Sequence, residues 1–226
     1  MGCTIRPIRV EERILIVGAN GTGKSVAATQ LLDSTSLPVI AVDVKGDFEL
    51  NQKASVIRKP NDWRLGLLPN RSYIYRPNLE YMDTDTWVLF FRTLWSRARK
   101  TGKKHPFFLY IDEAQFLSTG RVGREMANLA ITTRSMGMGL IITSQRPRWI
   151  PVEIRTEAWR WFVYWLTYER DRKEVGEYTA GRLTPEDFDR IDENHGFWKI
   201  ERGIKSPSHL EISLCSPFAR QENPPD

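Results

Sequence analysis

Residues 13–25 of the chain read RILIVGANGTGKS, a short apolar run with β-branched residues that ends in a glycine-rich turn. A helix-compatible stretch follows from Ser25 to Leu32, and a second apolar run, PVIAVDV, occupies residues 38–44. Strand, glycine-rich turn, helix and strand in this order form the βαβ unit of a parallel sheet. The sequence therefore predicts an α/β fold with a central, mostly parallel sheet flanked by helices.

The composition is that of an ordinary globular protein with one sizeable core. The chain has 226 residues, of which 41% are hydrophobic and 27% charged, and its net charge of +5 permits a nucleic-acid partner without requiring one. Two cysteines are too few for a disulfide framework or a cysteine-based zinc site. No apolar stretch approaches the ~20 residues that span a bilayer, and we expect no signal peptide. Secreted, membrane-spanning, collagen-like and disordered classes are excluded.

Further elements follow along the chain. Residues 59–71 are expected to form a surface loop, and residues 87–95 a helix with one apolar stripe, capped by Asp83 or Thr84 and ended by Gly102. Further strands are predicted at 72–75, 107–111, 139–144, 161–166, 197–201 and 209–215, and further helices at about 121–136, at 168–178 and from 184. The predicted organisation is a P-loop core at 1–150, an α+β extension at 151–220 packed on the same domain, and a flexible tail at 221–226.

The turn after the first strand fits the pattern G-x-x-x-x-G-K-[ST] at every fixed position. In such a loop, backbone N–H groups and the following helix N-terminus face phosphate oxygens. The lysine, Lys24, is expected to reach the β- and γ-phosphates, and the Ser25 hydroxyl to coordinate Mg²⁺. An accidental glycine-rich turn is the alternative. The predicted nucleotide-binding residues are Gly18, Ala19, Asn20, Gly21, Thr22, Gly23, Lys24, Ser25 and Val26.

Two carboxylates follow the strand at residues 107–111. A carboxylate at the carboxyl end of a buried parallel strand can reach the Mg²⁺ beside a phosphate loop, so Asp112 is the predicted second metal ligand. The adjacent Glu113 is then placed to polarise the attacking water and is the candidate base. A pair of acidic residues that caps the next helix is the alternative. No Asn-Lys-x-Asp element is present to read guanine, which favours ATP.

Two further catalytic candidates are an amide and an arginine. Gln145 ends the next strand, where its side chain can hydrogen-bond both the γ-phosphate and the water; a turn-forming polar cluster is the alternative. Arginine is the residue expected to stabilise charge on the transferred phosphoryl group. Arg134 is the leading candidate. The alternative for any one arginine is that it is only a solvent-exposed residue on a helix face. The rival arginines are Arg121, Arg124 and Arg146.

In combination and order, five motifs resemble the HerA–FtsK superfamily of DNA-pumping ATPases. They are the phosphate loop, VDVKGD at 42–47, IDEAQ at 111–115, TRSMG at 133–137 and TSQRP at 143–147. The short single-domain members that package the genomes of tailless, internal-membrane icosahedral viruses and phages are especially similar. The resemblance covers roughly residues 11–150 and implies a RecA-like fold of the additional-strand, catalytic-glutamate type.

The resemblance also implies site residues and partners. It gives Lys24 and Ser25 nucleotide roles, Asp112 and Glu113 metal and hydrolysis roles, and Gln145 the sensor role. It makes Arg134 the trans-acting finger, with Thr133 where the family usually has glycine. The implied assembly is a ring, expected to be a hexamer, that threads double-stranded DNA and meets viral capsid or membrane-vertex proteins. ATP is the expected small-molecule substrate, and the expected locations are the host cytoplasm and the packaging vertex of the virion.

Two clusters outside these motifs allow an interaction with DNA. Five cations fall between residues 97 and 104, where they can grip phosphates without reading bases or can simply be solvated at a helix C-terminus. Four tryptophans can stack on bases, although core and interface packing is the commoner role of such residues. These residues are Arg97, Arg99, Lys100, Lys103 and Lys104, and Trp149, Trp159, Trp161 and Trp165.

The leading hypothesis is an ATP-driven double-stranded DNA translocase that fills a preformed viral capsid. One alternative is a conjugation or chromosome-type DNA pump. The other is a virion-assembly ATPase that does not act on DNA.

Overall fold

A nine-stranded sheet in the strand order β3-β4-β2-β5-β6-β1-β7-β8-β9 forms the centre of the molecule. The computed structural model describes residues 7–64, 68–179, 181, 183–191 and 196–202, and the backbone of residues 210–215. The strands are β1 (Arg13–Val17), β2 (Val39–Val42), β3 (Ala54–Ile57), β4 (Ser72–Tyr75), β5 (Phe107–Ile111), β6 (Met138–Ser144), β7 (Arg160–Val163), β8 (Phe197–Arg202) and β9 (Leu210–Cys215).

The strands from β3 to β7 pair in parallel, and only β8 and β9 run antiparallel to their neighbours. Each residue of β1, β2, β5 and β6 is buried, as expected for strands covered on both faces. Because the carboxyl ends of parallel strands meet at one edge, the tips of β1, β2, β5 and β6 lie together there. We call this the carboxyl edge, and the opposite side the amino edge.

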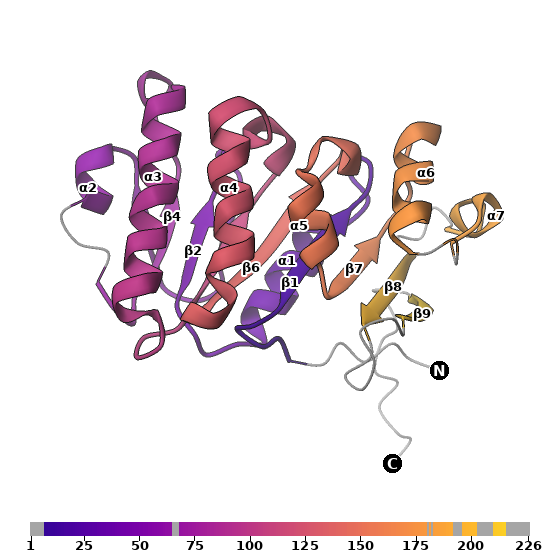
Figure 1. The fold of residues 1–226 in the computed structure, drawn as a ribbon, viewed down its shortest axis with the longest axis horizontal. Coiled ribbons are helices and arrows are strands. Elements are labelled where there is room, and N and C mark those ends of the chain that lie inside the picture. The colour runs from indigo at the N-terminus through magenta and orange to yellow at the C-terminus, as the bar shows by residue number, and fades with distance from the viewer. Residues whose placement is uncertain are drawn as a thin grey trace, which may run out of the picture.

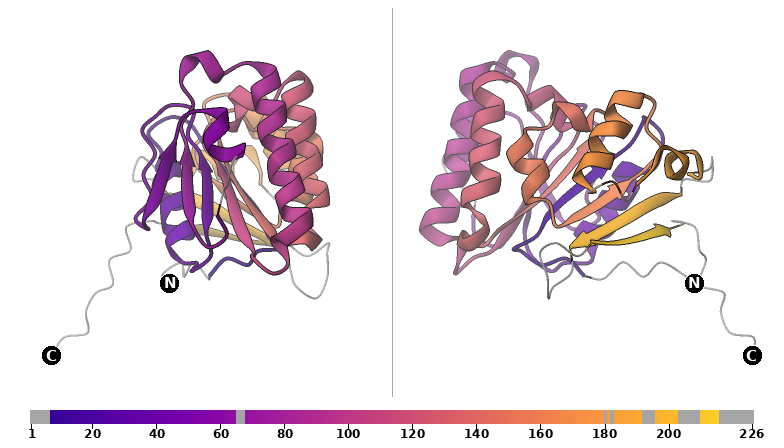
Figure 2. Two further views of the ribbon diagram at one scale, coloured as in Figure 1. Left: turned by 90° about the vertical axis from the view of Figure 1, so that its left-hand side faces the viewer. Right: turned by 45° about the vertical axis from the view of Figure 1, so that its right-hand side comes forward.

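Helices cover both faces of the sheet (Figures 1 and 2). Helix α1 (Lys24–Asp33) packs on one face, while α3 (Thr84–Arg97), α4 (Gly120–Thr132) and α5 (Val152–Glu157) lie side by side on the other. The two faces bury separate apolar clusters, so the sheet is the middle layer of three. The remaining helices are α2 (Pro60–Arg64), α6 (Glu169–Tyr178) and α7 (Pro185–Asp189).

Several sequence-based element predictions are confirmed, and some need correction. Asp83 caps α3, since its carboxylate accepts from Thr86 N at 2.9 Å. Helix α3, however, ends at Arg97 and continues as a π-helical turn, η2 (Ala98–Gly102). Residues 59–71 were expected to be all loop but contain α2. The edge strand β3 was not predicted; it has only four residues, and two of them are exposed.

The remaining differences lie around α4 and at the C-terminal end. The predicted helix at 121–136 is two elements, because α4 stops at Thr132 and a short 3-10 turn, η4 (Arg134–Met136), leads into β6. Strand β7 is shorter than predicted and pairs in parallel with β1, so residues after 150 continue the same sheet. The predicted tail at 221–226 lies outside the described residues. Within the described chain, no helix combines the length and the apolar character needed to cross a membrane.

Candidate functional site

The phosphate loop joins β1 to α1 at the carboxyl edge, and its glycines have separate physical roles. Gly21 and Gly23 have φ angles of 75° and 97°, which favour glycine because other residues are strained there. At Gly18, a Cβ atom would come within 2.5 Å of Tyr164 Cβ and 2.9 Å of Thr22 Oγ1. The glycine pattern therefore allows both the turn itself and its close approach to the chain after β7.

Backbone and side-chain contacts hold this loop in shape. The carbonyl of Ala19 accepts from Lys24 Nζ at 2.7 Å and from Thr22 Oγ1 at 2.9 Å. The Ala19 N–H donates to Trp165 O at 2.7 Å, which ties the loop to the segment after β7. Burial lowers the pKa of Lys24, an effect that the nearby Glu113 partly opposes. Lys24 therefore lies at the centre of the loop as a buried cation, near the carboxylates of β5.

Asp112 lies just past the end of β5 and is 4% exposed. Its Oδ1 accepts from Tyr110 OH at 2.8 Å and from Thr143 Oγ1 at 2.7 Å. Burial raises the pKa of Asp112, although these two hydrogen bonds oppose the rise. Both donors bind the same oxygen, which leaves Oδ2 without a hydrogen bond to any described residue.

Glu113 has an unusual backbone conformation, and its side chain accepts three hydrogen bonds. Its φ of 49° and ψ of 50° lie in the left-handed region, and its N–H donates to Thr143 Oγ1 at 3.0 Å. Its Oε1 accepts from Lys45 Nζ at 2.6 Å and Gln145 Nε2 at 2.7 Å, and its Oε2 accepts from Gln115 Nε2 at 2.5 Å. Left-handed backbone in a residue with a large side chain is often found at functional sites.

Burial alone would raise the pKa of Glu113. The hydrogen bonds from Lys45, Gln115 and Gln145, together with the charge of Lys24, outweigh burial and lower this pKa below its ordinary value. Glu113 is therefore ionised at neutral pH. Neighbouring Asp112 has the opposite shift, so the two adjacent carboxylates have different acid–base properties.

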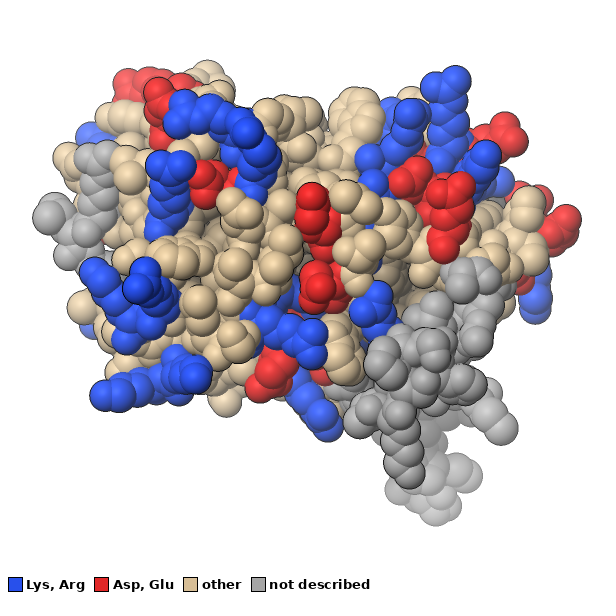
Figure 3. Space-filling view, viewed as in Figure 1, with Lys and Arg blue, Asp and Glu red and all other residues tan. Residues whose placement is uncertain are grey.

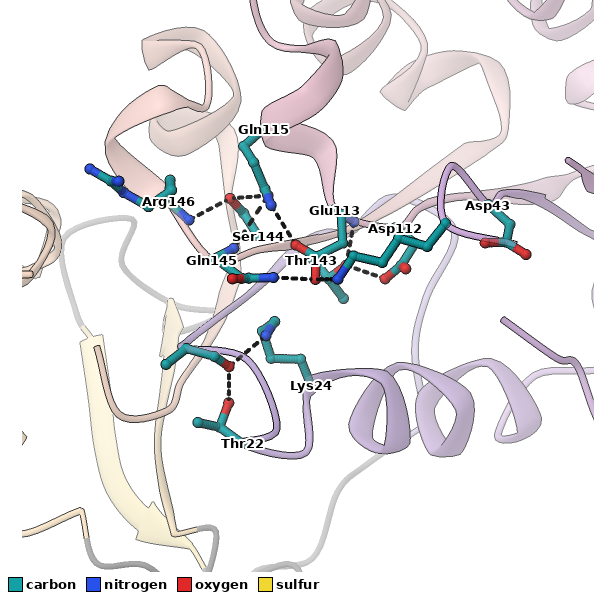
Figure 4. A network of polar contacts seen from close by, with 12 residues as sticks. Thr22, Lys24, Asp43, Asp112, Glu113, Gln115, Thr143, Ser144, Gln145 and Arg146 are labelled. Carbon is teal, nitrogen blue, oxygen red and sulfur yellow. Dashed lines mark hydrogen bonds and ion pairs between the residues drawn. The ribbon is translucent and has the colours of Figure 1, made fainter. Parts of the chain in front are cut away.

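A second layer of contacts fixes the two amides. Gln115 Oε1 accepts from Ser144 Oγ at 2.9 Å and from Gln145 N at 3.3 Å. Figure 4 shows Gln145 and Glu113 joined by a hydrogen bond, with Lys24 across from them on the phosphate loop. The tips of β1, β5 and β6 thus bring together four of the predicted site residues: Lys24, Asp112, Glu113 and Gln145.

The loop after β2 delivers Lys45 to this site. Asp43 is fully buried, and its carboxylate accepts from Gly46 N at 2.7 Å and from Arg76 Nε at 2.8 Å. These bonds hold the turn from which Lys45 reaches Glu113. Strand β2 pairs with β5, so the tips of the two strands lie side by side.

The residues at this edge are suited to a divalent cation of the Mg²⁺ type. Carboxylate oxygens of Asp43, Asp47 and Asp112 lie within 4.8 Å of one another, and Mg²⁺ prefers such hard oxygen ligands. Ser25 and Asp47 line one hollow beside the start of α1. Both carboxylate oxygens of Asp43 already accept hydrogen bonds that hold its own loop. The candidate metal ligands are therefore Asp112, Ser25 and Asp47.

Comparison with known proteins supplies the family. The chain is 30% identical over 179 residues to DNA packaging ATPase P9 of Enterobacteria phage PRD1, an alignment that covers 76% of this chain and 72% of P9. The chain belongs to the viral DNA-packaging ATPases. No protein-family profile matches it.

Solved structures show the fold of this packaging ATPase. The genome packaging NTPase B204 of Sulfolobus turreted icosahedral virus 2, in complex with ATP-gammaS, superposes with a TM-score of 0.68 at 17% identity, covering 93% of this chain and all of B204. The plasmid coupling protein TrwB has a TM-score of 0.63 at 11% identity, covering 92% of this chain and 85% of TrwB. These likenesses confirm the predicted RecA-like P-loop fold.

The candidate arginines of the packaging ATPase lie in different places. Arg134 is in η4 at the amino edge, far along β6 from the phosphate loop, with Glu157 at 3.7 Å and the ring of Trp159 at 5.1 Å. Arg121 pairs with Asp85 on the surface. Arg146 pairs with buried Asp171 and lies over the rings of Trp149 and Tyr168, whereas Arg124 is exposed. None of the four has an interaction with a phosphate-loop residue among the described contacts.

Sequence reasoning did not give roles to Lys45, Gln115 and Thr143, all of which contact the carboxylate pair of the packaging ATPase. Lys45 and Thr143 were visible as polar residues at strand ends, but their meeting with Glu113 and Asp112 depends on the order β2-β5-β6. Trp161 is buried, in agreement with the packing alternative for the tryptophans, while Trp149 and Trp165 are exposed.

Proposed function

We propose that the protein is an ATP-driven translocase that moves double-stranded DNA into a preformed viral capsid and hydrolyses Mg-ATP at the subunit interfaces of a ring. One observation carries this proposal: Glu113 and Gln145 are hydrogen-bonded to each other at 2.7 Å and face Lys24 of the phosphate loop. Membership of the DNA-packaging ATPases supports DNA as the translocated substrate.

In the proposed mechanism, the phosphate loop binds the triphosphate. Lys24 exchanges its bond to the Ala19 carbonyl for the β- and γ-phosphates, and the loop N–H groups bind the same oxygens. Ser25 and Asp112 hold Mg²⁺, which when bound neutralises charge on the phosphate oxygens.

Hydrolysis then depends on Glu113. Its lowered pKa keeps it ionised, so it can accept a proton from the attacking water. Two of its present partners, Lys45 and Gln145, bind the same carboxylate oxygen, Oε1. Release of Lys45 frees that oxygen for water, while the Gln145 amide remains to orient the water and to contact the γ-phosphate.

An arginine from a neighbouring subunit completes the site in this proposal. Arg134 lies at the amino edge and its own phosphate loop at the carboxyl edge, so a role for Arg134 in hydrolysis requires a second copy. A ring, which we expect to be a hexamer, places the η4 turn of one subunit beside the phosphate loop of the next. Capsid or membrane-vertex proteins would be the docking partners of such a ring.

The test is the ATPase rate measured against protein concentration, with and without linear double-stranded DNA at low salt. The proposal expects a rate per subunit that rises with concentration, because sites form at interfaces, and that rises again when DNA is added. A rate that is indifferent to DNA would favour the virion-assembly ATPase instead. A rate per subunit that is independent of concentration down to dilutions where the protein is monomeric would remove the interface mechanism.

A further inference from the structure

The turn between α3 and β5 carries exposed cations at the amino edge of the sheet. Arg99, Lys100, Lys103 and Lys104 are all exposed, and within the described part of the chain none of them forms an ion pair. Figure 3 shows Lys and Arg atoms gathered at the lower left of the molecule, below α3, without Asp or Glu atoms among them. We call residues 99–104 the basic turn.

The basic turn gathers several cations that have no carboxylate beside them in the described part of the chain. Elsewhere on the molecule, exposed cations often lie beside a carboxylate, such as Arg92 with Glu125 at 2.7 Å and Arg172 with Asp189 at 3.1 Å. Like charges held together without counter-charges repel one another, which costs stability unless a polyanion offsets the repulsion. The cations of the basic turn are thus available to an external anion.

The fifth cation predicted for this cluster has a different role. Arg97 lies over the ring of Phe107, with its guanidinium carbon 4.8 Å from the ring centroid, and it is only partly exposed. It anchors the end of α3 to the start of β5. Arg99 also lies beside a ring, 5.3 Å from the centroid of Trp95, but it is exposed. The external surface is therefore formed by the four exposed residues.

The backbone of the basic turn is held firmly. Lys104 N and His105 N both donate to Thr101 O, at 3.0 and 2.8 Å. Gly102 packs so closely on η4 that an added Cβ would lie 2.1 Å from Met136 O. Four cations on a fixed turn lose less conformational freedom on binding than four cations on a mobile loop.

We propose that the basic turn binds the phosphate backbone of duplex DNA without reading its sequence. Exposed lysines suit this role, because they contact phosphates as point charges and have no fixed geometry toward base edges. The turn lies at the edge opposite the phosphate loop, so DNA and nucleotide bind at separate surfaces. This inference rests on the proposed function, since it takes duplex DNA as the substrate.

The fold gives this surface a direct connection to the hydrolytic residues. The basic turn leads into β5, and the other end of β5 carries Asp112 and Glu113. Gly102 also contacts η4, the turn that carries Arg134. DNA bound at the basic turn therefore contacts an element that is joined to the carboxylate pair by one short, fully buried strand.

The experiment replaces Lys100, Lys103 and Lys104 together by alanine and measures binding of a fluorescein-labelled duplex of mixed sequence over a range of salt concentrations. Each phosphate contact contributes about 0.9 to the slope of log K against log salt, so we expect the slope to fall by about 2–3 and the affinity at low salt to fall about tenfold or more. The same three positions replaced by arginine should keep both the slope and the affinity.

The matched control replaces three exposed lysines on other elements, Lys53, Lys59 and Lys173, by alanine, which removes the same charge. Equal affinities and slopes for the two alanine variants would overturn the inference. So would a loss of binding to phosphatidylglycerol vesicles with DNA binding intact, which would make the turn a membrane contact. If the unaltered protein fails to bind duplex DNA, the proposed function falls as well. If the unaltered protein binds and the basic-turn variant binds equally well, only this inference falls and the proposed function survives.

Discussion

The two edges of the sheet differ in how their charged groups are satisfied. At the carboxyl edge, the polar side chains around Glu113 are buried or half-buried and hydrogen-bonded to one another at 2.5–2.7 Å. At the amino edge, the lysines of the basic turn are exposed and lie without carboxylate partners in the described chain. One edge is arranged to hold a few groups in fixed geometry, whereas the other presents charge to a partner.

This difference follows from the parallel sheet itself. Residues that leave the buried centre of the sheet at strand tips stay close together, so side chains from separate motifs meet at one edge. The connections at the amino edge need only return the chain and are free to carry charge outward. Variants at the two edges should therefore fail in different ways. At the carboxyl edge they should affect the chemistry of the subunit's own site, and at the amino edge they should affect stability, DNA binding or the site of a neighbouring subunit.

The largest expected effect is a loss of ATP hydrolysis in a variant of Arg134, which lies at the amino edge and is proposed to act on the site of the next subunit. Arg134→Ala should lower the ATPase rate about 10³-fold or more, because an arginine finger stabilises charge in the transition state. Mixing this variant with Lys24→Ala, which cannot bind nucleotide, should restore part of the rate, since some sites then combine an intact loop with an intact arginine. Absence of any recovery in mixtures that form joint rings would place the finger elsewhere.

Glu113→Gln tests the chemistry of the carboxyl edge alone. The amide keeps the size of the side chain but cannot accept the proton, so hydrolysis should fall about 10²–10⁴-fold. Binding of a fluorescent ATP analogue should change little, because Lys24 and the loop are intact. Near-normal turnover would show that another group activates the water.

Gly137→Ala should disturb the packing at the amino edge and lower the stability of the fold, while the nucleotide-site residues at the carboxyl edge stay unchanged. Gly137 has a φ of 81°, and an added Cβ would lie 2.3 Å from Gly102 O. Strain and overlap together should cost about 2–4 kcal/mol of unfolding free energy, measured by urea denaturation. Gly181→Ala is the control, since Gly181 has a φ of 73° but open space around it, and should cost only about 1 kcal/mol. Equal losses in the two variants would mean that the Gly102 contact is unimportant.

Lys45→Met tests, at the carboxyl edge, how Lys45 controls the ionisation of Glu113. The hydrogen bond from Lys45 lowers the pKa of Glu113, so its loss should raise that pKa. Since Glu113 works when ionised, the acidic limb of the pH–rate profile should move toward neutral pH. Release of the carboxylate should also raise the DNA-free rate by up to about tenfold, the equivalent of one charge-assisted hydrogen bond of ~1.5 kcal/mol. Lys45→Arg should behave like the unaltered protein; an acidic limb that stays in place would argue against this role.

The smallest effect is expected for stability at Asp112. Burial raises its pKa, so the folded protein binds this proton more tightly than the unfolded chain does, and stability falls as pH rises through the folded pKa. Asp112→Asn keeps the acceptor for Tyr110 and Thr143 and removes the charge. In EDTA at neutral pH, Tm of the variant should rise by about 2–4 °C for each kcal/mol gained in the free energy of unfolding. This rise in Tm should be smaller at acidic pH. A lower Tm at both pH values would show that the ionised carboxylate is stabilising.

The elements that the sequence predicts well are those whose signals are local. The phosphate loop, Asp112, Glu113 and Gln145 each directly follow an apolar strand, and parallel strands bring such positions to one edge. Lys45 and Gln115 were missed as partners of Glu113, because their roles depend on which strands are neighbours and on the short turn after β5. The sequence does not distinguish the five cations between residues 97 and 104. The structure shows that Arg97 packs on the ring of buried Phe107 and so differs from the other four.

The pairing of β7 with β1 has a practical consequence. The segment after β7 holds the phosphate loop through the bond from Ala19 N to Trp165 O, and β7 itself covers one side of β1. A protein truncated near residue 150 would expose that side of β1 as a bare row of amides and carbonyls, which is a template for self-association. Attempts to trim this ATPase to a minimal catalytic fragment should therefore keep the chain past β7 and Trp165, so that β1 stays paired and the phosphate loop stays anchored.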